Sequence, residues 1–107
     1  MPLTWDNLPS MSSKKTIIAV VGGRVVEPGL LAEAERAGGL LAAAGALVIT
    51  GGLGGVMEAA SKGALEAGGL TVGILPGEDT SLANPHVTVP VATGLGIARN
   101  VIIAQTA

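Results

Sequence analysis

Apolar positions along this chain form two kinds of pattern, continuous short runs and a repeat of three to four residues. Three short aliphatic runs are continuous and end at glycine or proline, and they cover residues 16–21, 46–50 and 70–75. Continuous runs of this length are typical of strands that are buried on both faces, as in a parallel sheet. The pattern therefore predicts three buried strands.

The residues between these runs repeat their apolar positions every three or four residues, which predicts helices at 28–44 and 56–67. Pro28 suits a first helical turn. Gly38 and Gly39 each cost a helix about 1 kcal/mol relative to alanine, so we expect them to serve a close approach of this helix to the sheet. Alternating strands and helices predict a Rossmann-like, three-layer αβα fold with a parallel sheet.

The last third of the chain is less regular. Residues 86–91 alternate but contain Pro90, so they predict a marginal strand whose place in the sheet the sequence does not assign. A final helix is expected from about 96 to 105, with Thr93 as its cap. That helix is apolar almost all round, and such a helix requires burial on several sides.

Length and local composition predict one folded unit. The polar, aperiodic residues 1–15 predict a disordered leader, and residues 16–107 predict a Rossmann-like nucleotide- or phosphate-binding unit. The first strand requires a neighbour on each side, and the second strand supplies only one of them. We therefore expect the N-terminal portion of a larger domain, with an exposed apolar edge or with that edge covered by another subunit in a homo-oligomer.

Composition excludes several classes of function. The net charge is −2 with only six lysines and arginines, which argues against duplex nucleic acid as a partner. The chain has no cysteine and a single histidine, so disulfides, thiol catalysis and a multi-histidine metal site are excluded, and we predict no metal. No apolar segment reaches the ~18 residues of a membrane helix, so we expect no membrane partner and a cytoplasmic location.

The first candidate binding residues lie in two glycine turns. Residues 51–55 hold four glycines, follow a predicted strand and precede a predicted helix, and free amides at a helix start bind phosphate. Gly22-Gly23 follows the first strand, and both turns are expected on one rim because parallel strands share their carboxyl edge. The alternative is that the glycines only permit tight turns and close packing. The predicted phosphate-binding residues are Gly22, Gly23, Gly51, Gly52, Gly54, Gly55 and Val56.

A second group of candidate ligand-binding residues lies near the end of the chain, at Thr93, Gly94, Arg99 and Asn100. Arg99 is the only cation among the apolar neighbours of this region. An arginine on an apolar helix usually has a fixed anionic partner, which points to a phosphate or a ligand carboxylate. The alternative is that its side chain extends to solvent. Asn100 adds a directed amide.

Glu58 and His86 are open to more than one interpretation. Glu58 stands four residues before Lys62 and could pair with it on the helix surface, or it could accept a hydrogen bond from a ribose or base. His86 follows Asn84-Pro85 without an acid nearby in sequence, and it is expected to be a solvated loop side chain.

Five stretches between about 16 and 107 resemble the Lonely Guy (LOG) superfamily, and they read IAVVGG, TGGLGGVMEAASKGALEAGG, TVGILPG, ANP and TGLGIARNVI. The closer likeness is to an uncharacterised bacterial branch that is related to molybdenum-cofactor carrier proteins. The resemblance implies a Rossmann-like fold that is commonly dimeric. LOG enzymes are phosphoribohydrolases that split cytokinin nucleoside 5′-monophosphates into base and ribose phosphate. By this resemblance, 51–55 is the phosphate-binding turn, Gly22-Gly23 is the first-strand turn and Arg99 is the active-site arginine.

Two departures from the LOG pattern leave the function open. The second LOG motif, PGG-x-GT-x-x-E, supplies the glutamate taken as catalytic and would begin after Ala107, and Asn100 stands where those enzymes have lysine. The leading hypothesis is a binding module for a nucleotide or another phosphorylated small molecule, including a molybdopterin-type cofactor that the protein would carry. The alternatives are a LOG-type phosphoribohydrolase that uses Glu58, and a truncated chain that needs a partner. No catalytic residue is assigned.

Overall fold

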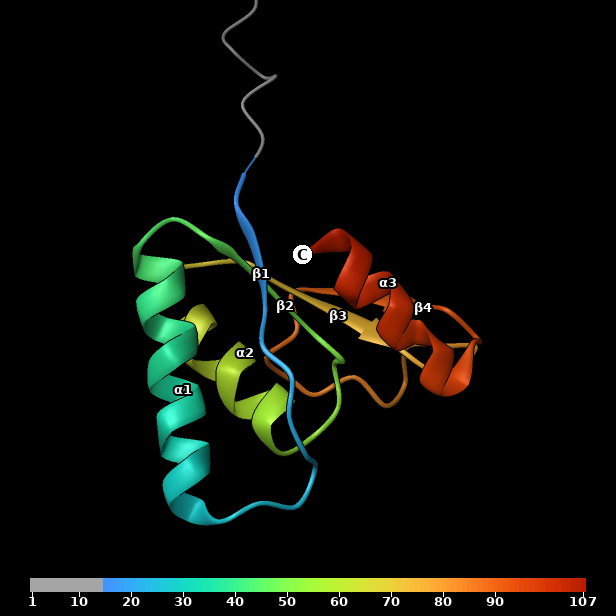
Figure 1. Ribbon diagram of the computed structural model, residues 1–107, viewed down its shortest axis with the longest axis horizontal. Helices are drawn as coiled ribbons and strands as arrows, with labels where there is room; N and C mark the ends of the chain where they lie inside the picture. The colour runs from blue at the N-terminus through green and yellow to red at the C-terminus, as the bar shows by residue number, and fades with distance from the viewer. Residues whose placement is uncertain (1–14) are drawn as a thin grey trace, which may run out of the picture.

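Four parallel strands form one sheet in the order β1-β2-β3-β4 in the computed structural model, which describes residues 15–107 (Figure 1). The elements along the chain are β1 (Ile17–Ala19), α1 (Pro28–Ala43), β2 (Leu47–Thr50), α2 (Val56–Glu66), β3 (Thr71–Leu75), β4 (Val89–Ala92), the 3₁₀ turn η1 (Gly96–Ala98) and α3 (Arg99–Thr106). The predicted leader at 1–15 lies outside the described residues apart from Lys15. The predicted parallel sheet is confirmed.

The strands pair along their buried runs. In β2, Ile49 lies opposite Ala19 of β1 and opposite Val72 of β3. The marginal strand predicted at 86–91 joins the sheet as β4, in parallel beside β3. Among the described residues β4 is an edge strand, and an edge tolerates Pro90, which has no amide N–H to donate.

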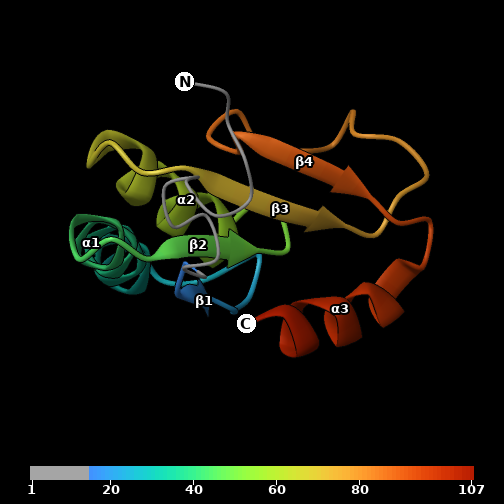
Figure 2. The same cartoon turned by 90° about the horizontal axis from the view of Figure 1, so that it is seen from above.

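The sheet lies between two helical layers, as expected (Figure 2). α1 and α2 pack on one face, where the hydroxyl oxygens of Thr50 in β2 and Ser61 in α2 are 3.3 Å apart. α3 packs on the other face, where Ile103 joins Ile49 and Ile74 in a buried cluster. Because side chains alternate across a strand, the neighbours Ile49 and Thr50 face opposite layers.

Glycines bring α1 and α2 together. A Cβ on Gly38 would collide with the backbone carbonyl of Ala60, and a Cβ on Gly63 would collide with the backbone carbonyl of Glu35. The close approach expected from the glycines of α1 is therefore made to α2 rather than to the sheet. This tight pairing fixes the position of α2, and with it the place where α2 begins at the rim of the sheet.

α3 follows the 3₁₀ turn without a side-chain cap on either element. The hydroxyl of Thr93 donates to the carbonyl of Leu75 at 2.6 Å and accepts from the amide of Leu95 at 3.2 Å. The prediction that Thr93 caps the last helix is therefore wrong, because this side chain ties the end of β4 to the end of β3 instead.

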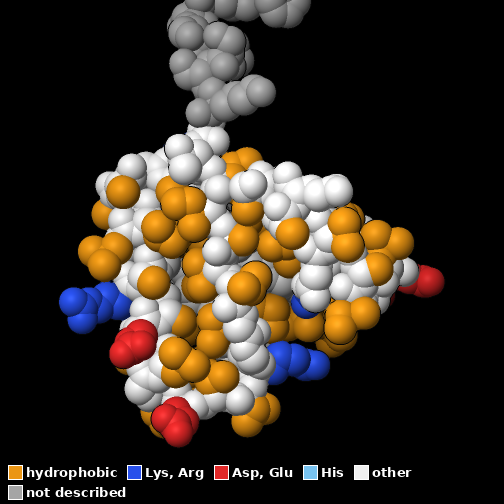
Figure 3. Space-filling model, in the orientation of Figure 1, with side chains coloured by type: hydrophobic (Ala, Val, Ile, Leu, Met, Phe, Trp, Pro, Cys, Tyr) orange, Lys and Arg blue, Asp and Glu red, His pale blue; other side chains and the backbone are white. Residues whose placement is uncertain are grey.

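Part of α3 and of the turn before it remains uncovered. Ile103 is buried, but Val101 is 57% exposed and Ile97 is 84% exposed. Among the described residues β1 pairs only with β2, and Val21, just beyond β1, is 69% exposed. Figure 3 shows apolar side chains spread over this face of the molecule with few charges between them. This surface agrees with the expected apolar edge, while the homo-oligomer stays a prediction.

Among the residues that the structure describes, no helix has both the length and the apolar character needed to cross a bilayer.

Candidate functional site

The carboxyl ends of the four strands share one rim, where ligands of open parallel sheets bind. Gly22-Gly23 follows β1, and residues 51–55 follow β2. The amide of Gly94, after β4, donates to the carbonyl of Gly77, after β3, at 2.7 Å. Thr93 and Gly94 therefore reach the same rim as the glycine turns. Their polar groups, however, are already hydrogen-bonded to the end of β3 and to the loop that follows it.

The two glycine turns are in direct contact. The amide of Val56, the first residue of α2, donates to the carbonyl of Gly23 at 3.0 Å. Gly55 has a positive φ of 69°, and a Cβ there would collide with that same carbonyl, so the contact requires glycine. A Cβ on Gly22 would lie 2.7 Å from the Cβ of Val56. Val56 thus joins the turns together, and its amide is not free for a ligand.

The turn after β2 presents amides that lack acceptors among residues 15–107. Within the part of the chain that the structure describes, the N–H groups of Leu53, Gly54 and Gly55 donate to no backbone or side-chain group. No side chain caps the start of α2 either. Free N–H groups and the positive end of a helix dipole both favour an anion at this position.

Gly54 is the open position of this turn. A Cβ there would meet no atom within 4 Å, and its φ is not positive. The fold therefore does not require glycine at residue 54, which distinguishes it from Gly55. A missing side chain at an open position leaves room for a ligand to approach the backbone.

Arg99, on α3, is a buried cation without a counter-charge among the residues that the structure describes. The residue is only 8% exposed. One of its terminal nitrogens, Nη1, donates to the Oδ1 of Asn100, and Nη2 lies 4.0 Å from the Sδ of Met57. Its Nε has no partner, and no described carboxylate lies within ion-pair distance of the guanidinium. Burial lowers the pKa of the Arg99 guanidinium because it disfavours the charged form.

A pocket of about 550 Å³ adjoins this guanidinium between the end of β1 and α3. Its lining is Ala19, Val21, Gly22, Arg99, Asn100, Ile103 and Ala104. A Cβ on Gly51 would lie 2.7 Å from Nη2 of Arg99, so the guanidinium packs on the first residue of the turn after β2. The structure thus brings Gly22, Gly51, Arg99 and Asn100 together, and Arg99 does not extend to solvent.

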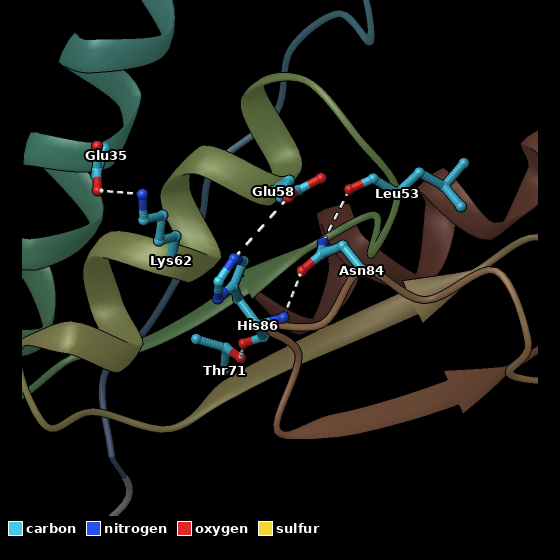
Figure 4. A network of polar contacts seen from close by, with 7 residues as sticks. All are labelled: Glu35, Leu53, Glu58, Lys62, Thr71, Asn84 and His86. Atoms are coloured by element: carbon cyan, nitrogen blue, oxygen red, sulfur yellow. Dashed lines mark hydrogen bonds and ion pairs between the residues drawn. The ribbon is translucent and has the colours of Figure 1, made fainter.

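The charged residues of α2 form different pairs from the one considered in the sequence. Lys62 lies 3.5 Å from the carboxylate of Glu35 on α1, and Glu58 lies 3.9 Å from Nε2 of His86 (Figure 4). The Glu58–Lys62 pair is therefore not formed, and His86 has an acid beside it. Glu58 lines a separate groove of about 450 Å³ between α1 and α2, so the structure does not place it in the Arg99 pocket.

Comparison with known proteins identifies the family of this chain. The model of the SLOG cluster4 family matches residues 15–107. The chain belongs to the SLOG cluster4 family. This confirms the resemblance to the LOG-like superfamily that the motifs indicate.

Relatives of this SLOG cluster4 chain include two solved structures with the same fold. The molybdenum cofactor binding protein from the phototrophic bacterium Rippkaea orientalis is 42% identical, with a TM-score of 0.86, over 89% of this chain and 60% of that protein. The Moco carrier protein from Chlamydomonas reinhardtii is 41% identical, with a TM-score of 0.77, over 88% of this chain and 59% of that protein. An uncharacterised protein from Archaeoglobus fulgidus is 45% identical over 89 residues, which are 83% of this chain and 58% of that protein. The chain therefore spans about three-fifths of the length of each of these relatives.

Sequence reasoning missed one residue of the SLOG cluster4 rim. Asn84 is 8% exposed and holds the turn after β2 by two hydrogen bonds, to the carbonyls of Gly52 and Leu53. The signal in the sequence is the Asn-Pro pair at 84–85, which favours a turn in which the asparagine side chain binds its own backbone. Such a pattern predicts the local turn but not the distant loop that it contacts.

Proposed function

We propose that this chain binds a phosphorylated small molecule in the pocket beside Arg99. The observation that carries the proposal is the state of Arg99, whose guanidinium is buried while none of the described carboxylates pairs with it. A buried charge without a counter-charge is strongly unfavourable, and a ligand of opposite charge removes that cost. Gly51, on which the guanidinium packs, opens the turn with the free amides, so that an anion here has both a cation and N–H donors available.

The size and lining of the pocket favour a ligand with a ring system attached to its phosphate. A volume of about 550 Å³ is within the range of small-molecule sites and far larger than a phosphate group needs. Ala19, Val21 and Ala104 give the pocket an aliphatic wall, against which a flat heterocycle can pack. Nucleotides and molybdopterin-type cofactors both combine a heterocycle with a phosphate.

The names of the relatives favour the second of these ligand classes. Two of them are a molybdenum cofactor binding protein and a Moco carrier protein. If this chain carries such a cofactor as cargo, the buried guanidinium of Arg99 fits its phosphate and the aliphatic wall fits its pterin. The chain has no cysteine and so offers no thiolate to the metal.

The proposal is tested by calorimetric titration with two matched pairs of compounds. AMP is compared with adenosine, and a pterin phosphate monoester is compared with the corresponding pterin alcohol. At least one phosphorylated member should bind, and its neutral counterpart should bind more weakly. Arg99→Met should lower that affinity by about 10- to 150-fold, because a hydrogen bond to a charged group contributes roughly 1.5–3 kcal/mol.

Arg36→Met is the matched control, since it removes an exposed arginine of α1 that lies outside the pocket lining. Its affinity should equal that of the wild type. The proposal is overturned if no phosphorylated compound binds better than its neutral counterpart, or if Arg99→Met binds as well as the wild type.

Gly54 offers a second test that leaves the fold intact. Gly54→Val should abolish binding, because the side chain would occupy space that the proposal assigns to the ligand, while the melting temperature should change little. Unchanged affinity in a folded Gly54→Val variant would remove this turn from the site.

The same titration samples also show whether the protein hydrolyses AMP, although we do not propose this activity. Glu58, the carboxylate considered for a phosphoribohydrolase, lines the groove between α1 and α2 and not the Arg99 pocket. Chromatography of the AMP samples would detect free adenine. Release of adenine by the wild type that is lost in Glu58→Gln would establish the hydrolase.

A further inference from the structure

Asn84 contacts the turn after β2 through both its side chain and its backbone. Its Nδ2 donates to the carbonyl of Leu53 at 2.8 Å, and its own amide donates to the carbonyl of Gly52 at 2.9 Å. Its Oδ1 accepts from the amide of His86 at 2.9 Å, so every polar group of the side chain is engaged (Figure 4). Two consecutive carbonyls of the turn are therefore directed toward one residue.

These contacts fix the direction of two amides as well. In a trans peptide the C=O and the N–H point in opposite directions, and the structure has no cis peptide bond among the residues it describes. The carbonyl of Gly52 shares its peptide with the N–H of Leu53, and the carbonyl of Leu53 shares its peptide with the N–H of Gly54. With both carbonyls held by Asn84, both N–H groups point away from it.

These two N–H groups, together with that of Gly55, are the three in this turn that lack acceptors within the described chain. Consecutive backbone N–H groups held in one direction form an anion-binding concavity. A free loop would have to lose conformational entropy to reach this arrangement on binding, whereas a held loop has it in advance.

The loop that carries Asn84 has its own anchor, which is independent of the turn. The hydroxyl of Thr71 in β3 donates to the carbonyl of His86 at 2.6 Å, and the amide of Thr88 donates to the Thr71 hydroxyl at 2.9 Å. The loop is therefore secured to the sheet without the contacts to Gly52 and Leu53. Those contacts act on the turn rather than serving to hold Asn84 in place.

We propose that Asn84 is a positioning residue that directs the amides of Leu53 and Gly54 toward the phosphate of the ligand. This inference rests on the proposed function and adds the part of the site that the turn supplies. Asn84 itself does not contact the ligand; it acts through the two peptides that it holds.

The experiment is an NMR titration of ¹⁵N-labelled protein with AMP or the pterin phosphate, whichever binds in calorimetry. In the wild type the amide resonances of Leu53 and Gly54 should move on binding. Asn84→Ser removes the donor to Leu53 without adding charge, and its hydroxyl can still accept from the amide of His86. This variant should bind at least tenfold more weakly, and its Gly54 amide should no longer respond, whereas its Leu53 amide should still respond because the backbone amide of residue 84 keeps its bond to the carbonyl of Gly52.

Thr88→Ala is the matched control, because it removes a side-chain acceptor that the amide of Thr71 uses, at 3.2 Å, in the same loop. It leaves the contacts to Gly52 and Leu53 in place, so its affinity and its amide response should match the wild type. Comparing the two variants separates a positioning role from a general loosening of the loop.

The outcomes distinguish this inference from the proposed function. If the wild type binds but the two amides do not respond, or if Asn84→Ser binds as tightly as the wild type or Thr88→Ala weakens binding as much as Asn84→Ser does, the positioning role is overturned and the Arg99 site stands. If the wild type binds neither phosphorylated compound, the proposed function is overturned, and this inference with it.

Discussion

The guanidinium of Arg99 packs on the backbone of Gly51. A Cβ on Gly51 would lie 2.7 Å from Nη2 and 3.1 Å from Cζ of Arg99, as well as 2.6 Å from Sδ of Met57. The contact joins α3 to the turn after β2 across the carboxyl edge of the sheet. It places the buried cation beside the turn with the free amides, and no side chain at residue 51 separates them.

Gly51→Ala should therefore displace the guanidinium and weaken binding of the phosphorylated ligand at least tenfold. The loss of stability should be modest, because Met57 is flexible and can move away from the added methyl group. Calorimetry and thermal denaturation measure the two effects. Gly29→Ala, at a position with no atom within 4 Å of a Cβ, should change neither affinity nor fold. Equal affinity in Gly51→Ala would show that the contact between Arg99 and this turn is not part of the site.

Removal of the buried charge of Arg99 should not lower the stability of the ligand-free protein. Burial lowers the pKa of the Arg99 guanidinium, so its charged form costs the folded state free energy at every pH below that pKa, which includes neutral pH. Arg99→Met should thus melt at the same temperature as the wild type or higher. The ligand should stabilise the wild type by about 2.7 kcal/mol at 100 times its Kd, and should stabilise the variant by only about 0.3–1.4 kcal/mol at that concentration, given its 10- to 150-fold weaker binding. A large drop in the melting temperature of ligand-free Arg99→Met would mean that Arg99 has a structural partner.

The glycine contact between α1 and α2 makes a prediction about stability alone. Gly63→Ala should destabilise the protein by roughly 1–3 kcal/mol, because its Cβ would collide with a backbone carbonyl that cannot move independently of α1. Gly39→Ala is the matched control, since its Cβ would lie 3.4 Å from the carbonyl of Gly63 and it gains up to about 1 kcal/mol of helix propensity. Chemical denaturation compares the two. Similar stabilities of both variants would mean that the helices separate easily.

The exposed apolar residues of η1 and α3 predict self-association. Ile97 and Val101 are 84% and 57% exposed, and burial of such side chains between subunits is favourable. Sedimentation at micromolar concentration should show a species larger than the monomer, and the double variant Ile97→Glu, Val101→Glu should shift it toward the monomer. A wild type that is monodisperse as a monomer, and that binds no apolar dye, would contradict this prediction.

The continuous aliphatic runs predict the first three strands because burial on both faces of a parallel sheet leaves little choice of residue. The two glycine turns and Arg99 follow from the same logic, since strand order and strand direction bring the carboxyl ends together. The expected outer layers also follow from the alternation of strands and helices. These features depend on local pattern and on topology, which a sequence contains.

The features that the sequence did not predict depend on contacts between distant segments. Thr93 has the side chain of a helix cap, but the nearby carbonyl of Leu75 competes for its hydroxyl. Glu58 has Lys62 at the right helical spacing, yet Glu35 on α1 binds the lysine and His86 reaches the glutamate. Each of these pairings is decided by how the helices and loops pack, and neither spacing nor propensity contains that information.

The most direct test of the central claim is the NMR signal of the Arg99 Nε–H during a titration with the phosphorylated ligand. Its resonance can be assigned by its absence in Arg99→Met. We expect this signal to move when AMP or the pterin phosphate binds and to move far less with the neutral counterpart, while the exposed Arg36 signal stays in place. If a phosphorylated compound binds while the Arg99 signal remains unmoved, Arg99 is not part of the binding site.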